Sequence, residues 1–587
     1  MRKNSKNKAP QPRIDNFFGI LKDPHDKVPS PSNQNGMSSP ARSDNSRQNH
    51  PENNRLTLMA DNFRESDTKD EKELQGILKT LNASFESSKT IEIADDGDAE
   101  IISGNRKQQP SPSSRNDERM MEEYLSNRDN NTAVYRDRKL TLALPHHLPH
   151  LWKEVEPKLQ KVTKGSLQTM DDLLELIGDF IQLHYDRKIN RINLRVLVLL
   201  LETFNEKEVN YFFDTFLPFM GNLALRIEYL FKDEPIKILS QNIENQTAVT
   251  LSKEQVACLL SHMFFCTMHS QNNQYLPQDC NFSFLYRDAR RNELRLEKLK
   301  CFYNYFKRSQ ASSSLSTLNI TYQRLVFDVL THGNIDEKFW EGSKENLSKV
   351  IVLDEGAIEE RKGAIQVDFA NKFLGGGVLD SGCVQEEIRF AISPELVASM
   401  LFCERMLDHE AMIIMGAEQY SEYLGYSDTF RFVGDFKDKA ETDLFNRKDV
   451  TVLAIDAIDF SKTSTTRSQF QMAQILRELN KAYIGFYGSD QETGDRKEIA
   501  TGRWGCGNFQ GDPQLKFILQ WIAASKTNRT LVFYRFKDAA LKDMERVIRR
   551  IKDFKISELF EQLKFYNRMI FVDKVDMPLF DYLLDVA

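Results

Sequence analysis

The sequence predicts a three-layer α/β fold, preceded by an all-helical segment and a disordered N-terminal arm. After about residue 345, short apolar runs such as "KVIVL", "VTVLAID" and "RTLVFYRF" alternate with helical stretches, which is typical of buried strands covered by helices on both faces. Before that point, apolar residues recur at helical spacing, and the first part of the chain is polar. We therefore expect a disordered arm at 1–135, a helical domain at 136–344 and an α/β domain at 345–587.

The arm is predicted from composition. Nine of the 18 prolines precede residue 113, and Ser, Asn, Asp and Lys dominate stretches such as "SPSNQNGMSSPARSDNSRQNHPENN". Such a segment buries too little apolar surface to offset its chain entropy.

The net charge of the whole chain is −7, which provides no global basic field, so we predict no direct nucleic-acid site.

The helical segment follows from apolar periodicity. "SLQTMDDLLELIGDFIQL" places Leu167, Met170, Leu174, Ile177 and Ile181 at spacings of three and four residues. "LSKEQVACLLSHMFFCTM" begins with a Ser-x-x-Gln capping box. We find no cluster of titratable residues in this segment that would suggest catalysis, so we interpret it as a packing platform.

Cysteine usage and apolar runs bear on the compartment. The seven cysteines are scattered without CxxC pairs, which argues against a disulfide framework and against a zinc site. The first residues contain no apolar core of signal-peptide length, and the longest aliphatic run, Val196–Leu201, is far short of a membrane span. We expect a nuclear or cytosolic protein.

Two glycine-rich segments in the α/β half are candidates for binding phosphate. One is Gly375–Gly377, and the other is "TGRWGCGNFQGDPQ", in which Asp512 is a good N-cap and Pro513 suits a first helical turn. Glycines let backbone N–H groups approach a ligand, and a helix N-terminus favours negative charge. The two loops suggest two walls of one cleft that binds a diphosphate. The alternative is that each is an ordinary tight turn.

Two adjacent glutamates, Glu386 and Glu387, follow a helix start expected near Ser381–Gly382. Consecutive helical residues diverge by about 100°. The two carboxylates therefore cannot both point at one atom, and one can reach a substrate while the other is held aside. The alternative is a pair of acids that only caps the helix.

Taken together, the glycine triplet and Gln-Glu-Glu resemble the signature of the poly(ADP-ribose) glycohydrolase family. The resemblance covers "QVDFANKFLGGGVLDSGCVQEEIRFAISPEL", "GAEQYSEYLGYSDTFRF", "AIDAIDF", "RELNKAYIGF" and "ATGRWGCGNFQGD", which occur in order over about residues 345–525. It implies a macrodomain-like α/β/α sandwich with a mixed sheet. The helical segment resembles the accessory domain of that family.

The resemblance also implies roles for individual residues. Glu387 would be the catalytic acid/base, Glu386 would position a ribose, and Asp368 would support the site. The remaining substrate-binding residues implied are Ile358 and Glu359 for adenine, Asn371 and Gln385 for ribose and loop order, Gly375, Gly376 and Gly377 for diphosphate, Tyr426 on the adenine side, and Arg503, Trp504, Gly505, Cys506, Gly507, Asn508 and Phe509 in the second loop. Arg503 is a departure, because we expect Asn at this position in relatives.

The implied activity is hydrolysis of ribose–ribose O-glycosidic bonds in poly(ADP-ribose), which releases ADP-ribose and reverses poly-ADP-ribosylation in the DNA damage response. A protonated Glu387 would donate to the departing ribose hydroxyl and then, once ionised, activate water. An unperturbed Glu titrates near about 4.3, so the acid role requires a raised pKa. No metal and no cofactor are implied, and His409 is the only histidine in the signature-bearing region.

The arm contains a motif for a protein partner. "QPRIDNFF" matches Q-x-x-[ILM]-x-x-[FY]-[FY] through Gln11, Ile14, Phe17 and Phe18. This pattern binds the sliding clamp of DNA replication, proliferating cell nuclear antigen, and its alternative explanation is chance. "TIEIADDGD", Thr90–Asp98, weakly resembles a SUMO-interacting motif.

Two other functions remain open from the sequence. One is a macrodomain that binds ADP-ribose without hydrolysing it, although the intact Gln385-Glu386-Glu387 argues against this. The other is a non-enzymatic replication or repair scaffold that uses the α/β half as a nucleotide sensor. We expect a monomer with no membrane partner.

Overall fold

The computed structural model describes residues 141–586 except 185–192, 242–247, 272, 289, 328–331, 464 and 489–495. The predicted disordered arm at 1–135, the clamp motif at Gln11–Phe18 and the SUMO-interacting motif at Thr90–Asp98 lie outside the described residues. All described residues belong to one unit of the chain, Pro110–Ala587.

In this described part, eight strands form one mixed sheet in the order β1-β2-β5-β8-β4-β9-β10-β3. The strands are β1 (Ala248–Ser252), β2 (Asn319–Val326), β3 (Val350–Leu353), β4 (Ile365–Ala370), β5 (Glu410–Gly416), β8 (Lys448–Asp456), β9 (Ile499–Thr501) and β10 (Leu531–Tyr534). β8, β4, β9, β10 and β3 run parallel, whereas β1, β2 and β5 pair antiparallel. A separate hairpin joins β6 (Ser421–Leu424) to β7 (Arg431–Asp435).

Two strands of the sheet come from the segment that we expected to be all helical. β2 has the sequence "NITYQRLV", in which β-branched and aromatic residues favour a strand, and both Ile320 and Tyr322 are fully buried. It pairs with β5 from Thr321 to Val326, and β1 pairs with its other edge. The sheet therefore begins before residue 345, because β5 needs a neighbour that only the preceding segment supplies.

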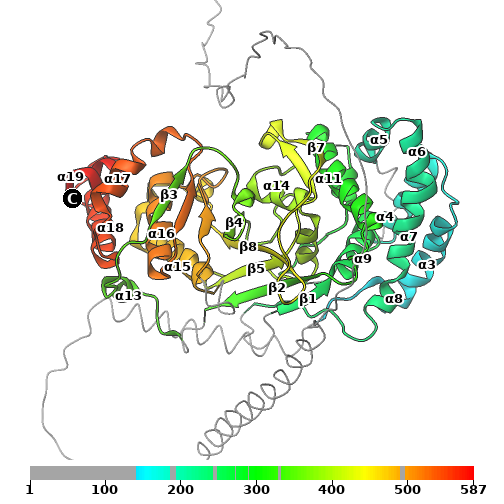
Figure 1. Cartoon of the computed structure of the whole chain (residues 1–587), viewed down its shortest axis with the longest axis horizontal. Coiled ribbons are helices and arrows are strands. Elements are labelled where there is room, and N and C mark those ends of the chain that lie inside the picture. The colour runs from blue at the N-terminus through cyan, green and yellow to red at the C-terminus, as the bar shows by residue number, and fades with distance from the viewer. Residues whose placement is uncertain are drawn as a thin grey trace, which may run out of the picture. The chain divides into compact units, whose positions relative to one another are not determined.

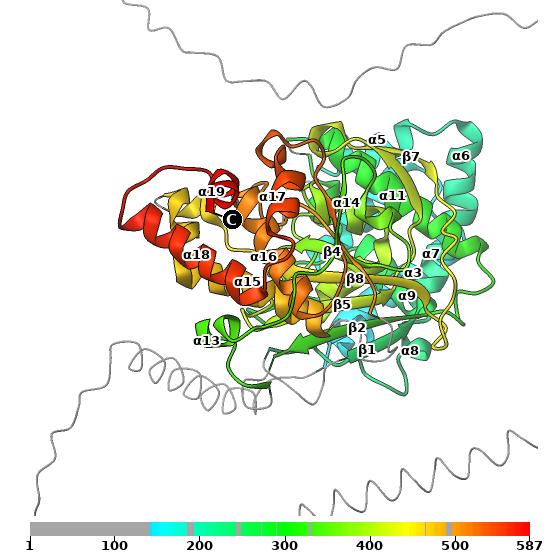
Figure 2. The ribbon, with the colours of Figure 1, turned by 60° about the vertical axis from the view of Figure 1, so that its left-hand side comes forward.

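Helices cover the two faces of the sheet, as the three-layer prediction requires. Successive side chains of a strand point to opposite faces. On β8, Val452 and Ala454 enter one core, and Leu453 and Ile455 enter the other. Figure 2 shows α15, α16 and α18 on one side of the sheet, and α9, α11 and α14 on the other.

Apart from β1, the segment before β2 is mainly helical, and Figure 1 shows it packed beside the β1 end of the sheet. Its elements are η1 (Pro145–His147), α3 (Pro149–Thr163), α4 (Met170–Gln182), α5 (Arg195–Glu202), α6 (Glu206–Tyr211), η2 (Phe212–Phe216), α7 (Leu217–Leu225), α8 (Ile227–Leu230), α9 (Lys253–Phe264), α10 (Ser283–Tyr286) and α11 (Asn292–Ala311). The expected capping box is present, because Ser252 and Gln255 exchange hydrogen bonds at the start of α9. Core residues of this segment and of one sheet face form one cluster, so the two are packed together.

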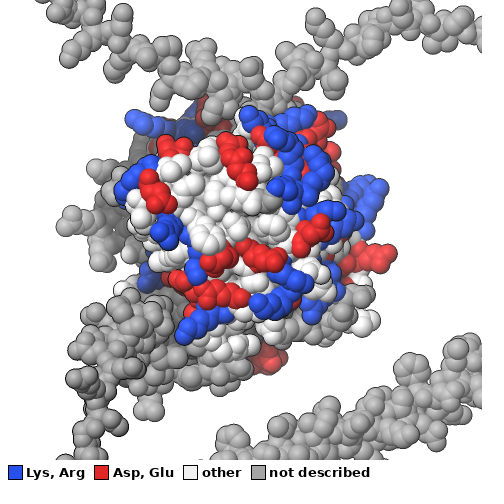
Figure 3. Space-filling model, turned by 90° about the vertical axis from the view of Figure 1, so that its left-hand side faces the viewer, with Lys and Arg blue, Asp and Glu red and all other residues white. Residues whose placement is uncertain are grey.

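The remaining helices belong to the α/β half. They are α13 (Glu337–Glu341), η3 (Ile358–Glu360), α14 (Gln385–Ile392), η4 (Pro394–Leu401), η5 (Ser427–Thr429), η6 (Phe460–Lys462), η7 (Thr466–Phe470), α15 (Met472–Gly488), α16 (Pro513–Lys526), η8 (Ala539–Leu541), α17 (Met544–Ile551), α18 (Ile556–Phe571) and α19 (Leu579–Val586). Figure 3 views the side that carries α17–α19, where acidic and basic side chains are interspersed around an uncharged centre. None of the helices within the described residues is both long and apolar enough to cross a bilayer.

The five parallel strands bring distant loops to one edge of the sheet. The carboxyl ends of parallel strands meet at the same edge, and ligands of α/β sheets bind outside that edge. After β4 comes the glycine triplet with Glu386 and Glu387, and after the adjacent β9 comes the second glycine loop. The predicted walls of the site therefore follow neighbouring strands.

Candidate active site

The glycine triplet lies in the loop that joins β4 to α14. Gly375 and Gly376 both have positive φ, at +85° and +49°, which favours glycine over residues with a side chain. Turns continue through Gly382, so α14 begins at Gln385 rather than near Ser381–Gly382 as expected. The two glutamates consequently occupy the first turn of the helix.

Glu386 is held by the backbone of the preceding loop. Its Oε1 accepts a hydrogen bond from Gly375 N at 2.7 Å, and its Oε2 accepts one from Asn371 N at 2.9 Å. Its side chain is buried. Burial raises the pKa of Glu386 well above its usual range, the charges of Asp368 and Glu387 raise it further, and the two backbone donors oppose this shift.

Glu387 is held in the same way by different residues. Its Oε1 accepts from Gly377 N and its Oε2 from Val384 N, both at 2.9 Å. The bond from Val384 is the one that a glutamate in the first turn makes to the residue before its helix. The capping explanation therefore accounts for one oxygen of Glu387, whereas the other oxygen binds the glycine triplet.

Both carboxylates converge on Gly376, although they are consecutive residues of a helix. A Cβ at Gly376 would lie 2.5 Å from Glu387 Oε1 and 2.7 Å from Glu386 Oε2. The glycine therefore leaves the space that both carboxylates occupy. The sequence explained the loop glycines by contact with phosphate, and the structure adds this steric requirement.

Asp368 lies on β4 beside the glutamates. It shares a strand face with Gln366 and Ala370, opposite the face of Val367, and it is buried. Neither of its carboxyl oxygens has a hydrogen-bond partner in the described structure. Burial raises the pKa of Asp368 from 3.8 to about 8, the charge of Glu387 adds to this, and Arg389 opposes it. This raised pKa favours the protonated form of Asp368 near neutral pH.

Gln385 and Asn371 order the backbone around the glutamates. The Gln385 amide accepts from Phe369 N at 2.8 Å and donates to the Val367 carbonyl at 3.1 Å, which ties α14 to β4. The Asn371 side chain accepts from Phe373 N at 3.0 Å. These hydrogen bonds hold the backbone around the glutamates, and the contact of Asn371 and Gln385 with ribose stays a prediction.

The second loop leaves β9 and ends at α16. Asp512 caps α16 by accepting from Leu515 N at 2.8 Å, as its position before Pro513 predicted. Gly505 has a φ of +73°, and a Cβ there would lie 2.7 Å from Ala457 Cβ. Arg503 is exposed and pairs with Asp538 at 2.6 Å. A diphosphate beside this loop would therefore meet a guanidinium that already has an acidic partner.

The other residues of this loop differ in accessibility. The Trp504 side chain is fully buried, and its indole N–H donates to the Ile455 carbonyl at 3.0 Å. Any contact of Trp504 with substrate is therefore left to its backbone. Cys506 and Phe509 are half-buried, and Phe509 packs against the second core. Gly507 and Asn508 are exposed.

The residues expected to contact adenine follow β3 and lie over the sheet face that carries Gln366 and Asp368. Ile358 and Glu359 begin η3 and are buried. The Glu359 carbonyl accepts from Gln366 of β4 at 3.2 Å, and its carboxylate accepts from the Tyr423 hydroxyl at 2.5 Å. Tyr423, from the β6–β7 hairpin, thus orients a predicted site residue.

Tyr426 connects the hairpin electrostatically to both glycine loops. Its side chain is 51 % exposed. Burial of the hydroxyl raises the pKa of Tyr426, the backbone of Gln385 and the charge of Arg503 lower it, and the charge of Glu387 raises it. Residues predicted from three separate motifs therefore influence one phenol.

Two cations near the glutamates escaped sequence reasoning. Arg389 of α14 is buried and donates to Gln366 Oε1 at 2.9 Å. Lys298 of α11 is buried and contacts the loop after the glycine triplet. The sequence signal for Arg389 is its position one helical turn after Gln385. For Lys298 there is no local signal, because its partners are about 80 residues away. Within the described residues, no group of His, Cys, Asp and Glu side chains is placed to hold a metal ion.

Comparison with known proteins agrees with this fold. Residues 337–543 match the family described as "Poly (ADP-ribose) glycohydrolase (PARG), Macro domain fold", and residues 204–324 match its "helical domain". The chain is 31 % identical over 467 residues to poly(ADP-ribose) glycohydrolase 1 of Arabidopsis thaliana, covering 65 % of this chain and 83 % of the relative. It is 35 % identical over 332 residues to poly(ADP-ribose) glycohydrolase 1 of Caenorhabditis elegans, covering 54 % and 40 %.

The α/β half is thus a macro domain that carries a carboxylate site, and it is preceded by a helical domain. The chain belongs to the poly(ADP-ribose) glycohydrolase family.

Proposed function

We propose that this chain hydrolyses the ribose–ribose O-glycosidic bonds of poly(ADP-ribose) and releases ADP-ribose. One observation carries the proposal: Glu386 and Glu387 are both held by backbone N–H groups of the loop that contains the glycine triplet. A diphosphate at the glycines then places a ribose near the carboxylates. The glycines and the carboxylates lie in one segment because the diphosphate and the ribose that they would contact belong to one ADP-ribose unit.

Glu387 is the proposed acid and base. As the glycosidic bond breaks, oxocarbenium character builds on the ribose being released. A protonated Glu387 donates its proton to the oxygen that leaves with the other ribose. The same carboxylate then activates the attacking water. Two carboxyl groups around one glycine do not flank opposite faces of a sugar, so the reaction differs from the usual scheme of two opposed carboxylates. The raised pKa of Asp368 favours its neutral form, which limits the negative charge beside Glu387.

Replacing the proposed catalytic carboxylate separates hydrolysis from binding alone. Glu387→Gln should retain ADP-ribose binding and lose release of ADP-ribose from labelled polymer by at least about a hundredfold, since the amide neither donates nor accepts the required proton. Calorimetry measures binding, and chromatography of the labelled products measures release. Glu154→Gln, at an exposed glutamate of α3, is the matched control.

Two outcomes would reject parts of this assignment. Near wild-type cleavage by Glu387→Gln would reject the role of Glu387. Binding without cleavage by the unmutated chain would instead favour the non-hydrolytic macro domain that acts as a scaffold.

The sliding clamp is a proposed partner, with the motif Gln11–Phe18 as its binding segment. The support is the pattern of Gln11, Ile14, Phe17 and Phe18, in which one helical turn would bring the three apolar residues together. A nuclear role in reversing poly-ADP-ribosylation during DNA repair would follow from this partner.

A pull-down with the purified clamp tests the motif. Phe17→Ala combined with Phe18→Ala should abolish capture, because both aromatic anchors are removed. A matched double substitution outside the motif, Asn33→Ala with Asn35→Ala, should leave capture unchanged. Equal capture of both double variants would reject the motif.

A further inference from the structure

A buried lysine of the helical domain donates hydrogen bonds to the loop next to the active-site carboxylates. The Lys298 side chain, on α11, is fully buried. Its ammonium donates to the carbonyls of Asp380 and Gly382, each at 2.6 Å, and of Gly377 at 3.3 Å. An ammonium has three N–H donors and no acceptor, so the three carbonyls match its donors in number.

The other side of the same loop contacts Glu387. Gly377 donates its N–H to Glu387 Oε1, while its carbonyl faces Lys298. A Cβ at Gly382 would lie 2.7 Å from Glu387 Oε1, and one at Gly377 would lie 3.1 Å from Gly382 Cα. The loop is therefore packed between the ammonium and the carboxylate, so a shift of its carbonyls also moves the donor of Glu387.

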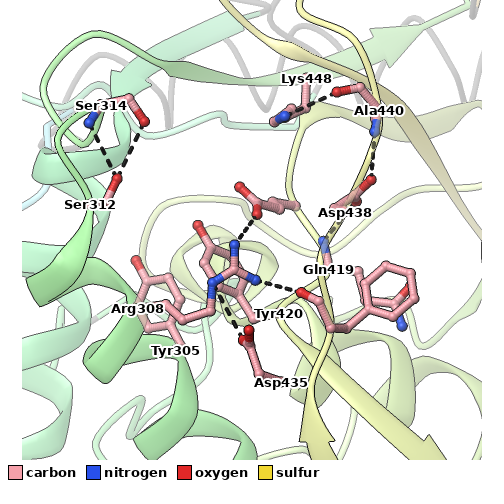
Figure 4. Close-up of polar contacts among 12 residues, drawn as sticks. Tyr305, Arg308, Ser312, Ser314, Gln419, Tyr420, Asp435, Asp438, Ala440 and Lys448 are labelled. Carbon is pink, nitrogen blue, oxygen red and sulfur yellow. Dashed lines mark hydrogen bonds and ion pairs between the residues drawn. The ribbon is translucent and has the colours of Figure 1, made fainter. Parts of the chain in front are cut away.

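Neighbouring residues of α11 hold other parts of the site. Arg295, one turn before Lys298, pairs with Asp380 of the loop, and Glu297 accepts from Phe432 N of the β6–β7 hairpin at 2.8 Å. Figure 4 shows Arg308 further along α11, where it contacts Asp435. Arg308 also donates to Glu418 at 2.6 Å. One helix thus contacts both the carboxylate loop and the hairpin that carries Tyr423 and Tyr426.

We propose that Lys298 is a positioning residue for the hydrolysis, which holds Gly377–Gly382 in the conformation that orients Glu387. This inference rests on the proposed function. Burial of an ammonium is costly, so its retention requires compensation. Burial lowers the pKa of Lys298 to about 8, the charges of Cys383, Glu387 and Asp380 oppose this, and Arg295 adds to it. The three carbonyls supply the direct hydrogen bonds.

The test compares three variants of the full chain. Lys298→Met keeps the length of the side chain but removes its donors, and Lys298→Arg keeps the charge but has a planar fork that cannot converge on three carbonyls. Lys307→Met makes the same change at an exposed position of α11 and is the control. The kcat and KM for release of ADP-ribose are measured below the thermal midpoint. They are corrected for the fraction that binds ADP-ribose in calorimetry.

We expect both Lys298 variants to lower kcat by about tenfold or more, with a smaller change in KM, because misplacement by about 1 Å is costly to catalysis. Lys307→Met should stay within about twofold of the unmutated chain. If Lys298→Met does not fold, Lys298→Arg carries the same expectation. A wild-type kcat in a folded Lys298→Met, or its restoration by Lys298→Arg, would overturn the inference while leaving the proposed function intact. An inactive unmutated chain would overturn both.

Discussion

At the scale of single residues, the site combines two kinds of buried carboxyl group. Glu386 and Glu387 each accept two backbone hydrogen bonds, which fix their orientation before a substrate arrives. Asp368 has no such partner, and its pKa is raised to about 8 mainly by burial. The loop therefore provides acceptors whose orientation is fixed, and the strand beside it provides a carboxyl that has a raised pKa and no hydrogen-bond partner in the described structure.

The raised pKa of Asp368 predicts a dependence of stability on pH. Between pH 3.8 and about 8 the folded state keeps a proton that the unfolded state releases, so stability falls as pH rises through this window. Asp368→Asn cannot lose that proton. Its thermal midpoint should therefore rise relative to the wild type as pH increases from about 5 to about 8. The corresponding gain in unfolding free energy is at most about 1.4 kcal/mol per pH unit.

Thermal melts at several pH values check this prediction. Asp354→Asn is the control, because hydrogen bonding to Arg535 lowers the pKa of Asp354 and both states are ionised above pH 5. The difference between Asp354→Asn and the wild type should stay constant there. A constant difference for Asp368→Asn as well would show that Asp368 is already ionised in the folded protein.

At the scale of elements, the loop between β4 and α14 depends on glycine for two reasons. Gly376 has a positive φ, and a Cβ there would occupy the space of both carboxylates. The first requirement concerns the backbone and the second concerns the two carboxylates. A substitution should therefore damage activity more than folding.

Gly376→Ala tests this dependence. It should lower kcat by about a hundredfold, because Glu386 and Glu387 must move to admit the methyl group. Steady-state kinetics and a thermal melt are the measurements. Gly178→Ala, on α4 of the helical domain, is the matched control, since a Cβ there meets nothing within 4 Å and its φ is not positive. Equal activity of both variants would mean that the carboxylates tolerate displacement.

At the scale of the whole molecule, the helical domain and the macro domain share one sheet. β1 and β2 precede residue 345, and β2 pairs with β5 along six residues. α11 contributes Lys298 and Arg295 to the carboxylate loop. Our expectation of a packing platform therefore understates the role of the segment. It supplies two strands of the sheet, and it also contacts the site.

A fragment that begins at residue 345 should not fold by itself. It would expose the edge of β5 and the face of the core cluster that the helical segment covers. Purified fragments 141–587 and 345–587 can be compared by thermal melting and limited proteolysis. We expect a cooperative transition and resistance to trypsin only for the longer one. A cooperative melt of the shorter fragment at the same temperature would contradict this expectation.

Much of the site was predictable because its residues are close in sequence. Asp368, the glycine triplet and Glu386–Glu387 lie within 20 residues, so a glycine-rich turn before a helix start already brings the carboxylates near the backbone of the glycines. Trp504 was harder to interpret. Its neighbours are polar, yet its indole lies in the core and donates to β8, a contact with a residue about 50 positions earlier.

By itself, the sequence determined the chemistry of this protein: which groups are present, in what order, and in which family they occur. The tertiary structure decided which of these groups meet. It placed the two glycine loops on neighbouring parallel strands, joined Tyr423 to Glu359, and inserted Lys298 beneath the carboxylate loop. The physical reason is that strand order and buried hydrogen bonds connect residues far apart in the chain, whereas sequence motifs record only local geometry.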